Sequence, residues 1–295
     1  MKYEGLVLSS GGIKGILQLG VLDFLYKNKY LESIKYYSGC SVGALISVLL
    51  SVGYTPHEIF DYICVNNIFN LIKYMNPLLV PNEFGVINIE LLHKYINTMV
   101  INKIGFVPTF EELEKMFDKK LIIPSCKLNG EDNFVYFTTE SNPTMSITKA
   151  AILSSSIPLI FTKSEYEGNL YIDGAIFDSF PINIQRTYFN DITNIGITFK
   201  NDVGLNFNKI KDYMYSIFMI IKKLEKNKEK VFQENDFIFE IKNELNGLEF
   251  DMTIDSAISL FLNGKKQISS YISSRTVEEV DNGSFVDNKI KEKND

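Results

Sequence analysis

The strongest candidate for a chemically active side chain is Ser41, which stands in the pattern Gly39-Cys40-Ser41-Val42-Gly43. An apolar, β-prone segment precedes this G-x-S-x-G pattern and an apolar helical segment follows it, which is the context of a nucleophile elbow. The sharp turn lifts the serine hydroxyl out of the sheet, and glycines flank it because a Cβ there would clash with the strand and helix. The following helix would aim its N-terminal amides at Ser41 and favour an oxyanion. A Gly-rich turn without chemistry has the same pattern, so Ser41 needs partners.

Donors for an oxyanion are available in the first glycine-rich loop, Ser9-Ser10-Gly11-Gly12-Ile13-Lys14-Gly15. Consecutive glycines there let the backbone amides of Gly11, Gly12 and Ile13 face a small anion. A phosphate-binding loop is the alternative, but the G-x-x-x-x-G-K-[ST] pattern is absent and G-x-G-x-x-G would need a glycine at Ser10. Lys14 opposes the dipole of the following helix by about 0.3–1 kcal/mol, which favours a structural role with a local partner.

The identity of the base is informative because the chain contains two histidines, His57 and His93. His57 lies inside the helix-capping sequence Thr55-Pro56-His57-Glu58, and His93 lies in the helical run 89–100, so both positions are typical of surface or packing residues. A Ser-His-Asp triad is therefore not expected. The best-placed acid is Asp173 in Asp173-Gly174-Ala175, directly after the expected strand 170–172. Asp-Gly is also an ordinary turn dipeptide.

The order and spacing of these motifs together resemble the patatin-like phospholipase family, the Ser-Asp dyad lipid acyl hydrolases. The family's oxyanion loop matches Ser10-Gly11-Gly12-Ile13-Lys14-Gly15, its G-x-S-x-G matches Gly39 to Gly43, and its D-G-[GA] matches Asp173-Gly174-Ala175. Residues 150–158 are similar to the family's small-residue helix ahead of a proline, and Pro181 falls where the family places one. The resemblance covers about residues 4–200.

Two positions depart from the family pattern. Ser10 replaces the first glycine of the oxyanion loop, and Asp178-Ser179-Phe180-Pro181 stands where the family often has Asn-x-Pro. Neither change removes a catalytic atom. Because backbone amides are the donors, Ser10 is tolerable provided that its φ is negative.

The resemblance implies a calcium-independent acyl-ester hydrolase with no metal or other cofactor. In that scheme Ser41 attacks the ester, Asp173 takes its proton, and the amides of Gly11, Gly12 and Ile13 hold the oxyanion. The implied substrate is a phospholipid or another acyl lipid, with transient contact at a membrane surface. A thioesterase or short-chain esterase would use the same residues, and a catalytically silent lipid-binding protein or a nucleotide-binding α/β domain are further alternatives.

The elements expected along the chain alternate between strands and helices, which predicts an α/β fold with a mostly parallel sheet. Strands are expected at 5–9, 34–38, 121–126, 134–138, 170–172, 192–199 and 237–241, and helices near 16–25, 44–52, 111–117, 146–154, 210–232 and 255–273. A further helix begins at the cap 55–58, and the chain is expected to be largely helical from 59 to 107. The resemblance implies the same class, a three-layer α/β/α sandwich related to the α/β hydrolases. No linker is visible, so we expect one domain over 1–280 and a polar tail over 281–295.

Composition narrows the function further. A net charge of −6 and only two arginines, Arg186 and Arg275, argue against nucleic-acid binding. The three cysteines, Cys40, Cys64 and Cys126, lack metal-ligand spacing and favour reduced thiols in the cytoplasm. No signal peptide is visible, and the uncharged stretch 36–56 is better explained by a core helix than by a membrane span. We therefore expect a cytoplasmic protein at the periphery of membranes, in which the apolar stretch 59–80 forms core, an acyl groove or a membrane contact.

Overall fold

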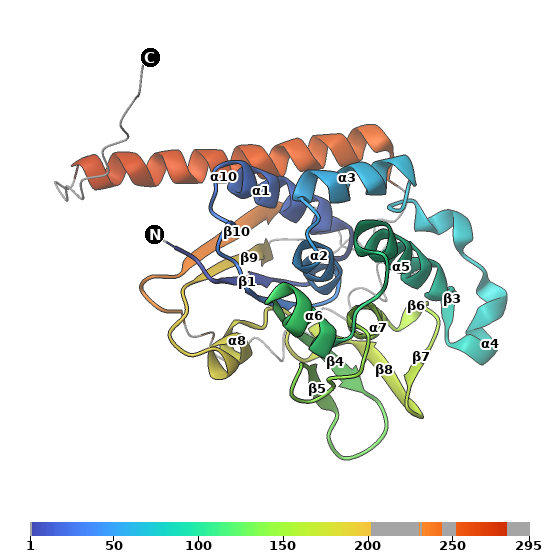
Figure 1. Ribbon diagram of the computed structural model, residues 1–295. Coiled ribbons are helices and arrows are strands. Elements are labelled where there is room, and N and C mark those ends of the chain that lie inside the picture. The colour runs from blue at the N-terminus through green and yellow to red at the C-terminus, as the bar shows by residue number, and fades with distance from the viewer. Residues whose placement is uncertain (1, 202–229, 231, 244–251, 282–295) are drawn as a thin grey trace.

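The computed structural model describes residues 2–201, 230, 232–243 and 252–281. Within these residues the central layer is an eight-stranded sheet in the order β10-β9-β1-β2-β4-β8-β7, with β5 paired to β4 (Figure 1). Its strands are β1 (Gly5–Leu8), β2 (Tyr36–Gly39), β4 (Lys120–Lys127), β5 (Phe134–Phe137), β7 (Ser164–Tyr166), β8 (Asn169–Asp173), β9 (Asn194–Asn201) and β10 (Phe237–Asn243). The pairs from β10 through β4 are parallel, and those that β4 forms with β5 and β8, and β8 with β7, are antiparallel. A second, two-stranded sheet pairs β3 (Gly85–Ile87) with β6 (Leu159–Phe161).

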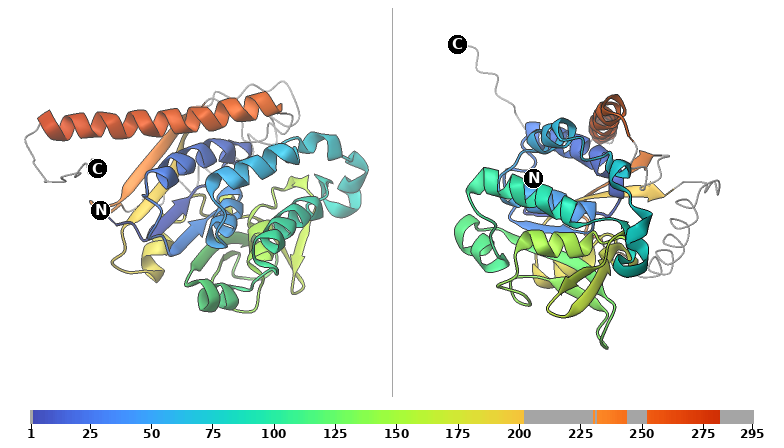
Figure 2. Two further views of the ribbon diagram at one scale, coloured as in Figure 1. Left: turned by 45° about the horizontal axis from the view of Figure 1, so that its top comes forward. Right: turned by 90° about the vertical axis from the view of Figure 1, so that its right-hand side faces the viewer.

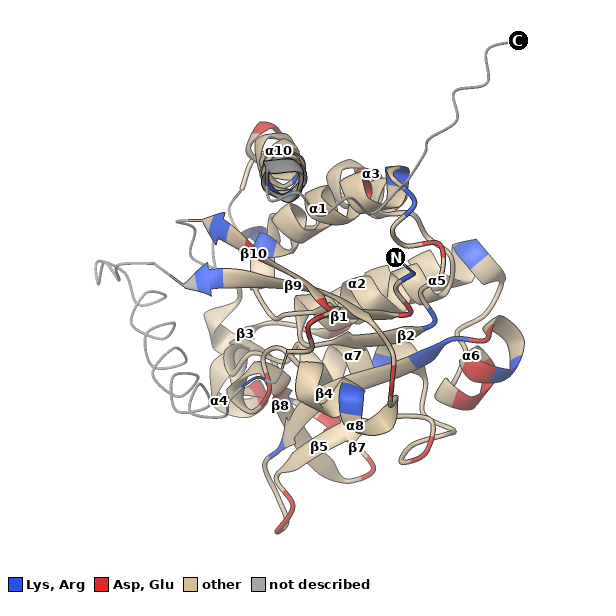
Figure 3. Cartoon of the chain, turned by 90° about the vertical axis from the view of Figure 1, so that its left-hand side faces the viewer, with Lys and Arg blue, Asp and Glu red and all other residues tan. Residues whose placement is uncertain are grey.

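Helices lie on both faces of the central sheet, so the described chain forms the expected α/β/α layers. Figure 3 shows α1 and α10 on one side and α8 on the other. The helices are α1 (Gly15–Lys27), α2 (Val42–Ser51), α3 (Pro56–Val65), α4 (Val80–Glu83), α5 (Glu90–Ile104), α6 (Phe110–Phe117), α7 (Ile147–Ser154), α8 (Ile182–Tyr188) and α10 (Ile254–Asp281).

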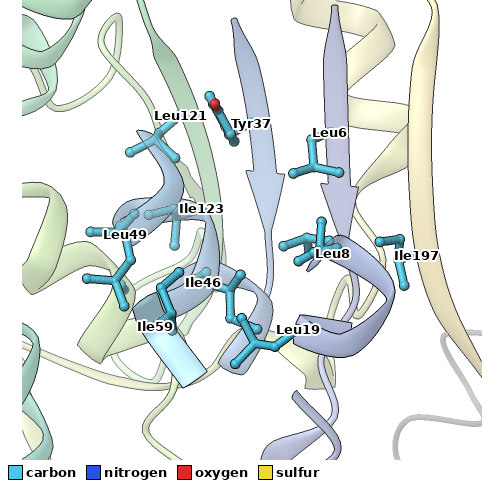
Figure 4. Close-up of a cluster of buried hydrophobic side chains, with 14 of the residues drawn as sticks. Leu6, Leu8, Leu19, Tyr37, Ile46, Leu49, Ile59, Leu121, Ile123 and Ile197 are labelled. Carbon is cyan, nitrogen blue, oxygen red and sulfur yellow. The ribbon is translucent and has the colours of Figure 1, made fainter. Parts of the chain in front are cut away.

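The central strand β1 is buried on both faces, as a parallel strand between helix layers must be. Leu6 and Leu8 point into the main core under α1 and α2, whereas Val7 packs against Phe180 and Ile182 on the α8 side. Figure 4 shows the main core, where strand side chains from β1, β2, β4 and β9 meet leucines and isoleucines of α1, α2 and α3. This packing fixes the carboxyl ends of β1 and β2, which carry the glycine loop and the serine elbow.

The long helix α10 packs against α1 with their backbones in contact (Figure 2). A Cβ on Gly20 or Gly264 would overlap the backbone of the opposing helix, so the crossing requires glycine at both positions. The buried Asp23 carboxylate accepts hydrogen bonds from Lys265 at 2.6 Å and Lys27 at 2.9 Å beside this crossing. Burial acts to raise the pKa of Asp23, but the two lysines outweigh it and hold the pKa below its ordinary value.

Most of the expected elements are present, and the differences concern short or late segments. The Thr55 capping box is formed, with Thr55 and Glu58 each bonding the other's backbone amide. The helical run expected from residue 59 to 107 is interrupted by β3, and β6, β7 and α8 were not predicted. Strands of three residues are too short to show a period and depend on distant pairing partners. α10 extends to Asp281, beyond the expected end near residue 273. The helix expected near 210–232 and the tail after 281 lie outside the described residues.

No single helix of the described chain is long and apolar enough to span a membrane. The helices α2 and α3 pass that test only as a pair, and they meet at a bend of 118°. The uncharged stretch 36–56 thus contains β2 and the mostly buried α2.

Candidate active site

Ser41 lies at the sharp turn between the end of β2 and the start of α2. Its backbone has φ 54° and ψ −123°, a conformation that non-glycine residues rarely adopt, and the residue is 4% exposed. A Cβ at Gly39 would overlap the carbonyl of Gly43, and one at Gly43 would overlap the carbonyl of Leu8. The two flanking glycines therefore permit the close approach of strand and helix that the elbow needs.

The Ser41 hydroxyl donates a hydrogen bond to the carboxylate of Asp173, with 2.6 Å between Oγ and Oδ2. Asp173 is the last residue of β8 and is 1% exposed. Its other oxygen, Oδ1, accepts from the amide of Ala175 at 2.8 Å, and its own amide donates to the carbonyl of Ser156 at 2.9 Å. The carboxylate is thus oriented on both sides, at a distance that suits proton transfer.

The helix α7 and the turn after it support both members of this pair. Ser154 Oγ accepts from the Ser41 amide at 3.0 Å, while the carbonyl of Ser156 holds the Asp173 amide. Ser156 Oγ in turn donates to the carbonyl of Ile152 at 2.8 Å. The sequence singled out segment 150–158 as a motif but assigned no role to these serines; their run of small polar residues at a helix end was the available signal.

The glycine-rich loop lies beside the serine, where the 3₁₀ turn η1 (Gly12–Lys14) runs into α1. Gly12 and Ile13 line the same cavity as Ser41, whereas Gly11 does not line it. Within the described residues, the amides of these three residues donate to no backbone carbonyl, although the Lys14 amide donates to the Gly11 carbonyl at 3.2 Å. Amides that line a cavity together with a serine hydroxyl, as those of Gly12 and Ile13 do, are the arrangement that an oxyanion requires.

From the sequence, Ser10 requires a negative φ and Lys14 a local partner, and the structure has both. Ser10 is not among the residues with positive φ, and its amide donates to the carbonyl of Ser179 at 2.8 Å. Lys14 is 3% exposed, and its Nζ lies 5.6 Å from the ring centroid of Phe199, a cation–π contact.

Phe199 and Val42 shape the glycine loop, and the sequence did not assign either of them to it. A Cβ at Gly11 would overlap the Phe199 ring, and one at Gly15 would overlap the Val42 side chain. The loop therefore packs closely against β9 and the start of α2, which explains why Gly11 and Gly15 cannot carry side chains. Gly174 is equally confined, because a Cβ there would overlap the carbonyl of Pro124.

Neither histidine approaches the serine. The His57 side chain is 52% exposed and lies 3.7 Å from Asp61 on the same helix. His93 Nδ1 lies 3.2 Å from Glu90, one turn away on α5. Neither residue lines the cavity that contains Ser41, so the carboxylate of Asp173 is the group placed to act on the hydroxyl.

An apolar cavity of about 130 Å³ opens beside Ser41. Its walls come from α1, α2, α3 and α5 and from the chain around residues 68–71 and 155–161, and its apolar lining includes Ile16, Leu19, Leu45, Ile46, Leu49, Ile59, Ile63, Ile68, Phe69, Leu71, Leu92, Ile96, Met99, Ile157 and Phe161. The apolar stretch 59–80 thus contributes both buried core and cavity wall.

In the described part of the chain, no group of three or more His, Cys, Asp or Glu side chains is arranged to hold a metal ion.

Residues 6–184 match the family described as "Patatin-like phospholipase", which is more than half of the chain. The chain belongs to the patatin-like phospholipase family. It is 38% identical over 201 residues to the "Probable lipid hydrolase 463L" of Invertebrate iridescent virus 6, covering 64% of this chain and 65% of that protein. It is also 29% identical to the "Uncharacterized protein R571" of Acanthamoeba polyphaga mimivirus, covering 92% of this chain and 94% of that protein.

Solved structures share the fold at low sequence identity. VipD from Legionella pneumophila superposes with a TM-score of 0.54 at 16% identity, over 93% of this chain and 67% of VipD. The type III effector ExoU gives the same TM-score at 18% identity, over 93% of this chain and 53% of ExoU. The patatin-like architecture is therefore shared, while this chain spans about half of the ExoU chain.

Proposed function

We propose that this protein is a lipid acyl hydrolase of the phospholipase A type that works through a Ser41-Asp173 dyad. The observation that carries the proposal is the buried 2.6 Å hydrogen bond between Ser41 Oγ and Asp173 Oδ2 at the edge of an apolar cavity. Membership of the patatin-like phospholipase family and the likeness to a viral protein named as a probable lipid hydrolase support it.

The proposed reaction has two acyl-transfer steps. Ser41 Oγ attacks the ester carbonyl while Asp173 Oδ2 takes the hydroxyl proton, and the amides of Gly12 and Ile13, which line the cavity with Ser41, stabilise the oxyanion. Gly11, the third predicted donor, does not line that cavity and would contribute only if the loop shifts when substrate binds. Asp173 then gives the proton to the departing alcohol, which leaves an acyl ester on Ser41. Water, deprotonated by Asp173, attacks this ester, and the fatty acid departs as Ser41 regains its proton.

An aspartate has an ordinary pKa of about 3.9 and is a weak base at neutral pH, so the scheme requires direct contact and a dry site. The geometry supplies both, since Asp173 is 1% exposed and touches the hydroxyl without an intervening group. The apolar cavity would favour an acyl chain, because a hydrocarbon buries its apolar surface against the apolar lining.

The test is fatty-acid release from mixed phospholipid and neutral-lipid vesicles in the presence of EDTA, comparing the wild type with Ser41→Ala and Asp173→Asn. Asparagine keeps an oxygen for the Ala175 amide but cannot accept the serine proton, so we expect a loss of about 10²- to 10⁴-fold. Asp118→Asn is the matched control, because Asp118 is exposed and its φ of 53° suits asparagine.

Four outcomes would contradict the proposal. Activity of Asp173→Asn within tenfold of the wild type would mean that another base serves Ser41. Dependence on calcium would mean that a metal takes part. An inert wild type that also fails to react with a fluorophosphonate probe would favour a silent lipid-binding protein, while cleavage restricted to thioesters or short acyl chains would favour the related esterases.

A further inference from the structure

Large apolar side chains are exposed on the segment that connects α3 to β3, which includes α4, and on β6. We call Tyr74, Met75, Leu78, Phe84 and Leu159 the apolar rim. Their exposed fractions include 84% for Leu78, 53% for Phe84 and 49% for Leu159. Isolated exposed leucines need no explanation, but a group of them at one edge marks a binding surface.

The rim residues belong to neighbouring segments at one end of the molecule, where Figure 1 shows α4, β3 and β6 together. The amide of Asn76 donates to the carbonyl of Val86 at 2.7 Å, which ties the 3₁₀ turn η3 (Pro77–Leu79) to β3. Gly85, the residue after Phe84, pairs with Leu159 across the two-stranded sheet. The segments that carry the rim residues thus lie next to one another, although they are far apart in the sequence.

This surface adjoins the cavity that contains Ser41. Leu71, three residues before Tyr74, lines the cavity, and so do Ile157 and Phe161 on the two sides of Leu159. The same segments therefore present apolar side chains inward to the cavity and outward to solvent. A hydrocarbon chain leaving the cavity along them would meet apolar atoms.

The charge pattern of the rim fits a lipid surface. Between Tyr62 and Asn82 the single charged residue is Lys73, although many side chains of this segment are exposed. Lys73 Nζ lies 5.0 Å from the ring centroid of Tyr74. Lys163 Nζ lies 5.7 Å from the ring centroid of Phe84, but it also lies 3.7 Å from Glu165, and Glu83 precedes Phe84, so acidic groups balance this second lysine. Tyrosine is favoured at the boundary of acyl chains and headgroups, and a segment with one charge in twenty-one residues can contact that boundary without burying many charges.

Two rim residues also hold a disfavoured backbone conformation. Phe84 has φ 60° and Leu159 has φ 67°, the left-handed region that side chains other than Gly, Asn and Asp avoid. Both present apolar side chains to solvent from these positions. Backbone strain of this kind is common at functional sites. Asparagine tolerates a positive φ, so it would fit the backbone better than Phe84 or Leu159 does.

We propose that the apolar rim is the surface by which the protein docks on a phospholipid bilayer, so that an acyl chain passes from the membrane into the cavity beside Ser41. The proposal deepens the proposed function and rests on it for the role of the cavity. Membrane docking can nevertheless be tested separately from the proposed function, because vesicle binding can be measured without hydrolysis.

The first experiment measures binding of the full chain to vesicles of phosphatidylcholine and phosphatidylglycerol by sedimentation, with Ser41→Ala present throughout to prevent hydrolysis. The test variants add Leu78→Asn, Phe84→Asn and Leu159→Asn, singly and together. We expect about tenfold weaker binding for each side chain that leaves the bilayer, which is roughly the transfer free energy of a leucine or phenylalanine. The control adds Leu262→Asn, an equally exposed leucine on α10 (55%), and should bind as the parent does.

The second experiment uses the same three substitutions with Ser41 intact and compares hydrolysis of vesicle lipids with that of a soluble p-nitrophenyl butyrate. The rim variants should lose vesicle hydrolysis and keep the soluble reaction. Vesicle binding that the triple variant retains would overturn the proposal, as would a parent that does not bind vesicles. A parent dimer that the rim substitutions dissociate, with vesicle binding unchanged, would instead make the rim an interface between copies. Failure of the proposed function would show separately, as absent hydrolysis in both assays while binding is unaffected.

Discussion

Replacing Ser41 with glycine should stabilise the protein relative to replacement with alanine, although both variants lose the proposed nucleophile. Both remove the hydroxyl that bonds Asp173, so that loss cancels between them. Alanine keeps a Cβ at φ 54° and ψ −123°, a conformation that costs a non-glycine residue about 1–3 kcal/mol. Glycine relieves this strain, but its greater backbone entropy stabilises the unfolded chain by about 0.4–1 kcal/mol. The net difference should be about 1–2 kcal/mol in favour of glycine.

The assay is urea unfolding of Ser41→Gly and Ser41→Ala, supported by thermal melts, in which the difference corresponds to about 2–6 °C. Ser47→Gly and Ser47→Ala form the control pair, because Ser47 is buried in the interior of α2, where helical geometry makes glycine the less stable choice by about 1 kcal/mol. The sign of the Gly–Ala difference should thus reverse between positions 41 and 47. Equal or greater stability of Ser41→Ala would refute the claim that the elbow stores strain.

Three further predictions concern the supports of the site and the α1–α10 contact. Gly43→Ala should destabilise the fold by at least about 2 kcal/mol, measured by the denaturant midpoint, because the new Cβ overlaps the backbone of Leu8; an unchanged midpoint would show that the elbow can relax. Ser154→Ala should cost about 1–3 kcal/mol of stability and lower kcat, since it leaves the buried amide of Ser41 without its acceptor; full activity would deny Ser154 a positioning role. The pKa of Asp23 is depressed in the fold, so its contribution to stability is present above the unfolded pKa of about 3.9 and is lost as the pH falls through the folded value. Unfolding free energies measured from about pH 6 to pH 3 should therefore fall less steeply for Asp23→Asn than for the wild type, and equal slopes would count against the ion pairs.

Much of the fold could be predicted because its signals are local. The helix α3 begins where Thr55 and Pro56 place it, and the apolar strands near β1 and β2 follow from short runs of buried residue types. By contrast, β3 and β6 are three residues each and exist through pairing between segments more than seventy residues apart. Such pairing leaves no period in either segment.

In the candidate site, too, residues with a local sequence motif could be predicted, whereas residues that act through long-range contacts could not. The motifs around Ser41 and Asp173 identified the residues that the structure brings within a hydrogen bond, because the chemistry of a nucleophile and a base restricts residue types. The roles of the supporting residues could not be predicted, even for Ser154 inside the motif 150–158, since the hydroxyl of Ser154 or the ring of Phe199 acts through tertiary contact with a backbone atom elsewhere. A serine or a phenylalanine in those positions has no distinguishing pattern of its own.

The absence of a histidine beside Ser41 explains why so many contacts fix Asp173. An ordinary carboxylate is less basic than imidazole by about 2.6 pKa units, which corresponds to about 3.5 kcal/mol of proton affinity. The proposed dyad must recover this deficit through position and exclusion of water, because direct proton transfer weakens as the distance between the two groups grows. The amide of Ala175 orients one carboxylate oxygen, the carbonyl of Ser156 holds the Asp173 backbone, and burial excludes solvent. Ser156→Ala, which removes a hydroxyl that holds this turn but no catalytic atom, should therefore lower kcat more than it raises KM; an unchanged kcat would mean that the backbone alone positions the base.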